Sequence, residues 1–127
     1  MEQLVGGWIV HDTHVVASAN IATTRRDRRR GMKAFPDASV PLVIDHCKWV
    51  HSFGMRFPVD VVYLDANDTI IAIRLLRPNR LARPVLRAVR VVETKPNAFR
   101  HWELGPGDSI HIRDAEFPPA TESAPAR

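Results

Sequence analysis

Short apolar runs alternate with polar turns along the chain, and this pattern predicts a mainly β fold. The run from 59 to 64 is the strongest strand candidate, because nearly every residue in it is β-branched or aromatic. Both parities of this run are apolar, so we expect both of its faces to be covered. Further strands are predicted at 8–10, 15–22, 40–44, 49–51, 69–76, 88–94 and 109–113.

Two short helices are predicted between these strands. Thr24 and Asp27 have the spacing of a capping box, so a helix should start at Thr24 and run to about Phe35. Gly31 within it costs helix stability, which indicates close packing against a neighbour. A second helix is predicted from 96 to 103, with Pro96 in its first turn and Gly105 just past its end.

About seven short strands with one or two short flanking helices predict a mainly β (α+β) fold, built as a small sandwich or barrel. A chain of 127 residues has the length of one domain. We therefore expect a single globular domain over 1–113. Residues 114–127 contain Pro118, Pro119 and Pro125 among small and polar residues, and we predict a disordered tail.

Composition narrows the class of protein. The hydrophobic content of 45% and the charged content of 25% are ordinary for a globular domain. No apolar run approaches the roughly 20 residues of a membrane span, and the N-terminus lacks the pattern of a signal peptide. Cys47 is the one cysteine, which fits a reducing compartment. We therefore expect a cytoplasmic protein without a membrane partner.

Arginine dominates the basic residues. The net charge is +4, and three lysines among 18 basic residues leave fifteen arginines. They cluster in the first predicted helix and in the loop from 77 to 87. Such clusters suit phosphate contact and suggest weak nucleic-acid binding. A charge of +4 is modest for that role, so we interpret both clusters as solvated surfaces and expect no nucleic-acid partner.

Reactive side chains concentrate between His46 and Asp65. Asp60 opens the strongest strand, where a buried carboxylate must be paired or hydrogen-bonded. We expect it to accept backbone N–H groups near Pro58 or to pair with Arg56. Glu93 has the parity of Val91 and is also expected to point inward. If the strands place Asp60 and Glu93 together, they could form an acid/base pair.

Cysteine and histidine offer a weaker possibility in the same stretch. In an extended segment, Cys47, Trp49 and His51 share one face, which suggests a metal site or a thiol nucleophile with its base. A zinc site needs at least three protein ligands, and no second cluster accompanies these residues. A lone cysteine is more often a small buried residue. We therefore expect no metal and no cofactor.

Five stretches, in this order and spacing, resemble the family catalogued as domain of unknown function 192. They are Ala22-Thr23-Thr24, Arg28 to Met32, Val50 to Asp65, Val91-Val92-Glu93 and Gly107-Asp108. The resemblance covers roughly Trp8 to Arg113. It implies a compact, mostly β fold with a flanking helix. It implies no activity, because the family is uncharacterised.

Three hypotheses follow for function. The first is a non-enzymatic binding module for a polar or anionic small ligand, with a site formed by His51, Met55, Arg56, Asp60 and Glu93. The second is a small hydrolase or lyase that uses Asp60 or Glu93 with His51. The third is weak nucleic-acid binding through the arginine clusters, which requires both clusters on one continuous face. A protein partner is left open.

Overall fold

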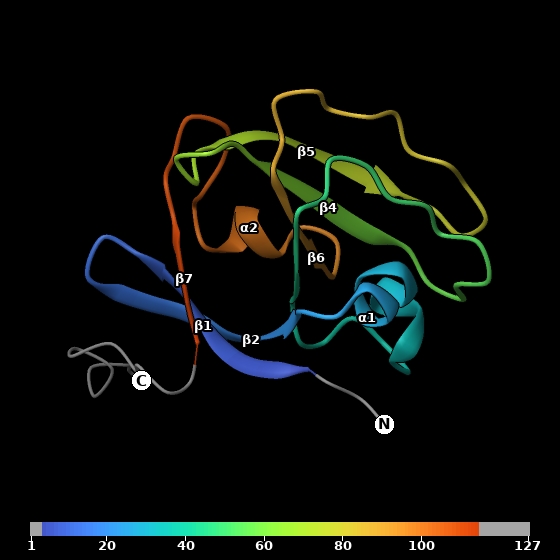
Figure 1. Ribbon diagram of the computed structural model, residues 1–127. Helices are drawn as coiled ribbons and strands as arrows, with labels where there is room; N and C mark the ends of the chain where they lie inside the picture. Colours follow the sequence, from blue (N-terminus) through green and yellow to red (C-terminus); the bar gives the residue numbers. More distant parts are fainter. Residues whose placement is uncertain (1–3, 115–127) are drawn as a thin grey trace.

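The computed structural model describes residues 4–114, which form one seven-stranded sheet in the order β5-β4-β6-β3-β2-β1-β7 (Figure 1). The strands are β1 (Val5–His11), β2 (His14–Ala22), β3 (Leu42–Asp45), β4 (Val59–Leu64), β5 (Ile70–Leu76), β6 (Arg90–Thr94) and β7 (His111–Asp114). Two short α-helices, α1 (Arg25–Arg30) and α2 (Ala98–His101), and a 3₁₀ turn, η1 (Gly31–Ala34), complete the elements. The predicted mainly β class is confirmed. None of the helices within residues 4–114 is long and apolar enough to cross a membrane.

The sheet bends back on itself without closing into a barrel. All neighbouring strands are antiparallel except β2 and β3, which are parallel. In Figure 1, β4 and β5 lie above β1 and β2, and α2 lies between these two halves. The Ile70 N–H donates to the Asp108 carbonyl at 2.8 Å, so the segment that leads into β7 contacts the start of β5.

Each face of the sheet carries its own apolar core, because successive residues of a strand point to opposite sides. On the α2 face, Val62 and Leu64 of β4 pack with Phe99 of α2. On the other face, called the loop face here, Val61 and Tyr63 pack under η1 and the loops that follow β3 and β5. The prediction that both faces of 59–64 are covered is confirmed.

The first helix begins as predicted and ends early. The Asp27 N–H donates to Thr24 Oγ1 at 3.1 Å, so the predicted cap is present. The α-helix ends at Arg30, because Gly31 takes a positive φ of 57°, and the chain continues as η1 to Ala34. The predicted α-helix to Phe35 was therefore too long by one 3₁₀ turn.

The second helix is shorter than predicted. Pro96 precedes it, because Asn97 takes a left-handed conformation with φ of 71° and separates the proline from the first turn. At the other end, Glu103 takes the left-handed conformation expected of Gly105, with φ of 60°. The helix is left with the four residues Ala98–His101.

Several strand bounds also differ from the prediction, as in β1, which is longer than the predicted 8–10. The predicted strand at 49–51 is a loop in the structure. Of these three residues, His51 makes an isolated bridge to Leu81, and Val50 is buried in the core. At the C-terminal end, Asp114 is the last residue of β7 and pairs with Gly7. Residues 115–127 lie outside the described part of the chain, so the tail stays a prediction.

Candidate functional site

A cavity of about 390 Å³ lies between α1 and the loop that follows β3. It brings together three consecutive arginines, a buried carboxyl, a histidine and a thiol. We call it the arginine pocket, and its lining is Arg28, Arg29, Arg30, Gly31, Ile44, Cys47, Trp49, Val50, His51 and Glu93. This mixture of cationic wall and ionisable groups makes it our candidate site.

The end of α1 sets the arginines against the pocket. The Arg28 guanidinium donates from Nη1 to the Thr23 carbonyl at 2.7 Å, which fixes one of the three side chains. The chain then turns at Gly31, whose positive φ suits glycine. A β-carbon at this position would lie 3.3 Å from Glu93 Oε1. Glycine therefore lets the end of the helix approach the carboxyl closely, as the sequence predicted for Gly31.

Glu93 is the buried ionisable group of the pocket. It projects from β6 onto the loop face and is only 2% exposed. Its Oε1 accepts the Met32 N–H at 2.9 Å. Burial raises the pKa of this carboxyl to about 7, and the Met32 hydrogen bond offsets part of the shift. The group therefore exchanges between its protonated and charged forms near neutral pH.

His51 and Cys47 also line the arginine pocket, and each is held by a contact with a neighbouring residue. His51 stacks on Phe53 with ring centroids 5.0 Å apart, and its Nδ1 accepts the Phe53 N–H at 3.2 Å. The Cys47 thiol donates to the Trp49 carbonyl at 3.2 Å. Burial raises the pKa of Cys47, which keeps the thiol protonated and weakens it as a nucleophile. Within residues 4–114, no three His, Cys, Asp or Glu side chains gather as a metal site.

The five site residues predicted from sequence separate in the structure. His51 and Glu93 meet in the arginine pocket. Met55 is buried in the core of the loop face, and Arg56 is exposed. Asp60 is half-buried on the α2 face, where its Oδ2 accepts the Asn97 N–H at 2.8 Å.

Asp60 and Glu93 do not converge. Val61, not Asp60, pairs with Glu93 across β4 and β6, so the two carboxyls lie on opposite faces of the sheet. An acid/base pair between them is excluded by this register. Asp60 does accept a backbone N–H, as expected, but the donor belongs to the start of α2 and not to the chain near Pro58.

Sequence reasoning missed the arginines of α1 as part of the site. It interpreted them as a solvated surface, because a net charge of +4 is modest for a protein that contacts phosphates through arginine clusters. The feature that could have revealed them is Gly31, since a glycine directly after an arginine run indicates that something packs closely there. In the structure, that neighbour is Glu93.

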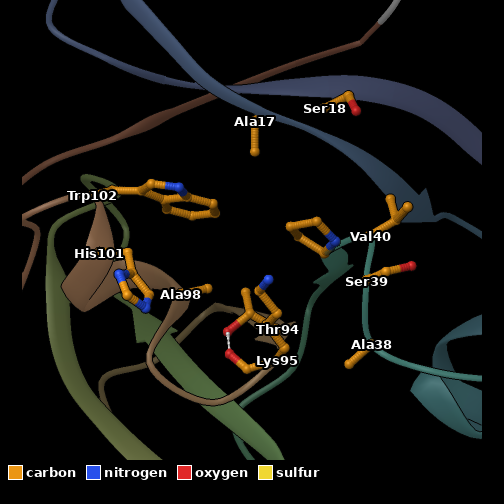
Figure 2. Close-up of a pocket in the computed structure, with 11 residues that line it drawn as sticks. Ala17, Ser18, Ala38, Ser39, Val40, Thr94, Lys95, Ala98, His101 and Trp102 are labelled. Atoms are coloured by element: carbon orange, nitrogen blue, oxygen red, sulfur yellow. Dashed lines mark hydrogen bonds between the residues drawn. The ribbon is translucent and has the colours of Figure 1, made fainter.

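A second cavity, of about 280 Å³, lies at the opposite face between β2 and α2 (Figure 2). Lys95, His101 and Trp102 border it on the α2 side, and Thr94 Oγ1 donates to the Lys95 carbonyl at 3.0 Å. Lys95 and His101 are both exposed, so this cavity has no buried ionisable group. None of the five predicted site residues lines it.

Comparison with known proteins identifies the fold. The profile of the family DUF192, described as "Uncharacterized ACR", matches residues 8–112. A protein proposed to be a transcription regulator from Sinorhizobium meliloti 1021 has a TM-score of 0.70 at 14% identity, over 87% of this chain and 95% of its own. A protein of unknown function from Novosphingobium aromaticivorans DSM 12444 has a TM-score of 0.67 at 12% identity, over 87% of this chain and 86% of its own. No curated protein matches the sequence significantly.

Proposed function

This chain belongs to the uncharacterised family DUF192, and we propose its function from its own residues: it is a small binding module that holds a polar or anionic small ligand in the arginine pocket. The observation that carries the proposal is the row Arg28, Arg29 and Arg30 along one wall of a 390 Å³ cavity. A guanidinium group can donate two parallel hydrogen bonds to the oxygens of a carboxylate or phosphate, which both strengthens binding and orients the ligand.

Glu93 restricts the ligand further. A charged, buried carboxyl repels an anion that comes close to it, whereas a protonated carboxyl or one that meets a hydrogen-bond donor does not. The ligand therefore places its anionic group against the arginines and a hydroxyl, amino or amide group toward Glu93. Trp49, which also lines the pocket, offers an apolar surface for the body of the ligand.

A small hydrolase or lyase is the second candidate. The observation that favours it is that Glu93, with a pKa of about 7, shares the pocket with His51. A group that titrates near the working pH is suited to general acid–base catalysis. Asp60, the other carboxyl considered for this role, has no part in the pocket because it lies on the opposite face. Turnover of small esters or phosphoesters that is lost in Glu93→Gln would support this candidate.

Calorimetric titration with inorganic pyrophosphate and citrate tests the binding proposal. Arg29→Ala should weaken binding about tenfold or more, because a hydrogen bond to a charged group contributes roughly 1.5–3 kcal/mol. Arg26→Ala is the matched control, since Arg26 is an exposed arginine of the same helix that does not line the pocket. Binding should also be tighter below the pKa of Glu93 than above it.

Two results would contradict the proposal. One is an equal loss of affinity in Arg29→Ala and Arg26→Ala, which would reduce the effect to net charge. The other is the absence of any heat with either anion on both sides of the pKa of Glu93.

A further inference from the structure

Two loops on the side of the sheet that carries α1 are joined into one surface: residues 46–58 after β3 and residues 77–89 after β5 (Figure 1). The Ser52 N–H donates to the Arg80 carbonyl at 2.8 Å, and the Ala82 N–H donates to the Val50 carbonyl at 3.0 Å. The Ser52 hydroxyl, on a fully buried residue, also accepts the Arg80 N–H at 2.9 Å. We call this surface the paired loops.

The paired loops expose large apolar side chains that the fold does not bury. The exposed fraction is 80% for Leu86, 59% for Leu81, 49% for Phe53, 46% for Trp49 and 43% for Val89. The bridge between His51 and Leu81 puts these two side chains on one side, while Val50 and Ala82 turn to the core. Five exposed hydrophobic residues on two joined loops indicate a contact surface and not scattered exposure.

The same loops are strongly basic. They contain Lys48, Arg56, Arg77, Arg80, Arg83 and Arg87, and neither loop contains an aspartate or a glutamate. The basic end of α1 adjoins them, since Arg28 to Arg30 line the arginine pocket together with Trp49 and His51. A partner of this surface must therefore combine negative charge with an apolar layer.

We propose that the paired loops dock this protein on the surface of an anionic lipid bilayer. Arginine and lysine contact the lipid phosphates, while leucine and aromatic side chains enter the boundary between headgroups and acyl chains. Leu81 and Leu86 distinguish this partner from nucleic acid, because phosphates and base edges give aliphatic side chains little to contact. Docking of this kind needs no membrane-spanning segment, but it revises the expectation from the sequence that the protein has no membrane partner. It does not depend on the ligand of the arginine pocket.

Vesicle sedimentation of the full chain tests this proposal. At physiological salt, the protein should sediment with vesicles of phosphatidylcholine mixed with phosphatidylserine and not with vesicles of phosphatidylcholine alone. The double variant Leu81→Ser/Leu86→Ser should reduce partitioning about tenfold or more, because burial of one leucine contributes roughly a factor of ten in an equilibrium constant. Its melting temperature should not fall, since both side chains are exposed.

The matched control is Val5→Ser/Val40→Ser, which changes two exposed valines outside the paired loops and should leave partitioning unchanged. The proposal is overturned if the anionic vesicles leave the protein in the supernatant, or if both double variants partition equally. Binding of single-stranded RNA in preference to anionic vesicles would overturn it and assign the surface to nucleic acid. Leu81→Ser/Leu86→Ser should keep the pyrophosphate affinity of the wild type, because neither leucine lines the arginine pocket, which separates this result from that of the pocket.

Discussion

The carboxyls on the two faces of the sheet have different surroundings, although they are close in the strand register. Asp60 on β4 is next to Val61, the residue that pairs with Glu93 on β6. On the α2 face, Asp60 is half-buried and accepts one N–H at the start of a short helix. On the loop face, Glu93 is almost fully buried, has a raised pKa and lines a cavity. The α2 face is covered by a short helix with cavities at its borders, whereas on the loop face a basic helix and two loops surround Glu93.

The difference shows that the state of a carboxyl depends on how much solvent contact it loses and on how far neighbouring groups compensate that loss. The carboxylate of Asp60 needs little compensation, because it keeps contact with solvent. The Glu93 carboxyl has one hydrogen bond from Met32 and is otherwise desolvated, which leaves it able to respond to a ligand or to pH.

The largest effect is expected on the α2 face, at Phe99, which is the largest fully buried side chain of α2. Phe99 is 1% exposed, and Phe99→Ala should lower the free energy of unfolding by roughly 3–5 kcal/mol, because it leaves a cavity between α2 and the sheet. Denaturant unfolding measures the loss. Pyrophosphate affinity of the folded fraction should not change, and a parallel loss of affinity would mean that the two faces are coupled.

On the loop face, Glu93→Gln should change how stability depends on pH. The folded pKa of about 7 lies above the ordinary 4.5, so the stability that the protonated form contributes is complete below pH 4.5 and is lost as the pH rises through 7. The difference between these values corresponds to roughly 3 kcal/mol. Glutamine keeps an acceptor for the Met32 N–H and cannot ionise. The free energy of unfolding of the variant should therefore rise relative to that of the wild type as the pH rises. A difference in unfolding free energy that does not change with pH would contradict the raised pKa of Glu93.

Asp60→Ala should have a smaller effect. It removes the acceptor of the Asn97 N–H at the start of α2, which should cost about 1–2 kcal/mol in denaturant unfolding. Asp60→Asn keeps an acceptor oxygen and is the control that should recover most of the loss. If Asp60→Ala weakened pyrophosphate binding, the placement of this carboxyl away from the site would be wrong.

The smallest effect on stability is expected for His51→Ala, under about 1 kcal/mol, because His51 is half-buried in a loop. Its loss should be seen in ligand affinity instead, since the ring lines the arginine pocket. Together with Asp60→Ala, this variant separates scaffold from site. If both substitutions lowered the free energy of unfolding equally, Asp60 could not be assigned to the scaffold and His51 to the site.

Local chemistry made parts of the fold predictable. The strand 59–64 was placed at its observed bounds, because a β-branched apolar run bounded by Pro58 and a polar turn has few other structures available. The start of α1 followed from the hydroxyl of Thr24, which needs only an N–H three residues away. The inward direction of Glu93 followed from strand parity with Val91.

Long-range contacts decided what the sequence could not show. Residues 49–51 have the composition of a strand, but a strand needs a partner, and the structure offers His51 only a single bridge to Leu81. The separation of Asp60 from Glu93 depends on the register between β4 and β6, which no local pattern encodes. The arginine wall depends on the turn at Gly31 and on the distant strand β6 against which it packs.

The pairing of β1 with β7 has a consequence for how the molecule folds. Gly7 pairs with Asp114, so β1 lacks one of its two neighbours until nearly the whole described chain has been synthesised. Closing such a long loop is entropically costly, and folds rich in distant pairings fold slowly. During synthesis, the β1–β2 hairpin therefore presents an unpaired edge on the ribosome. Until β7 is made, this edge is open to pairing with other chains, as unpaired strand edges are.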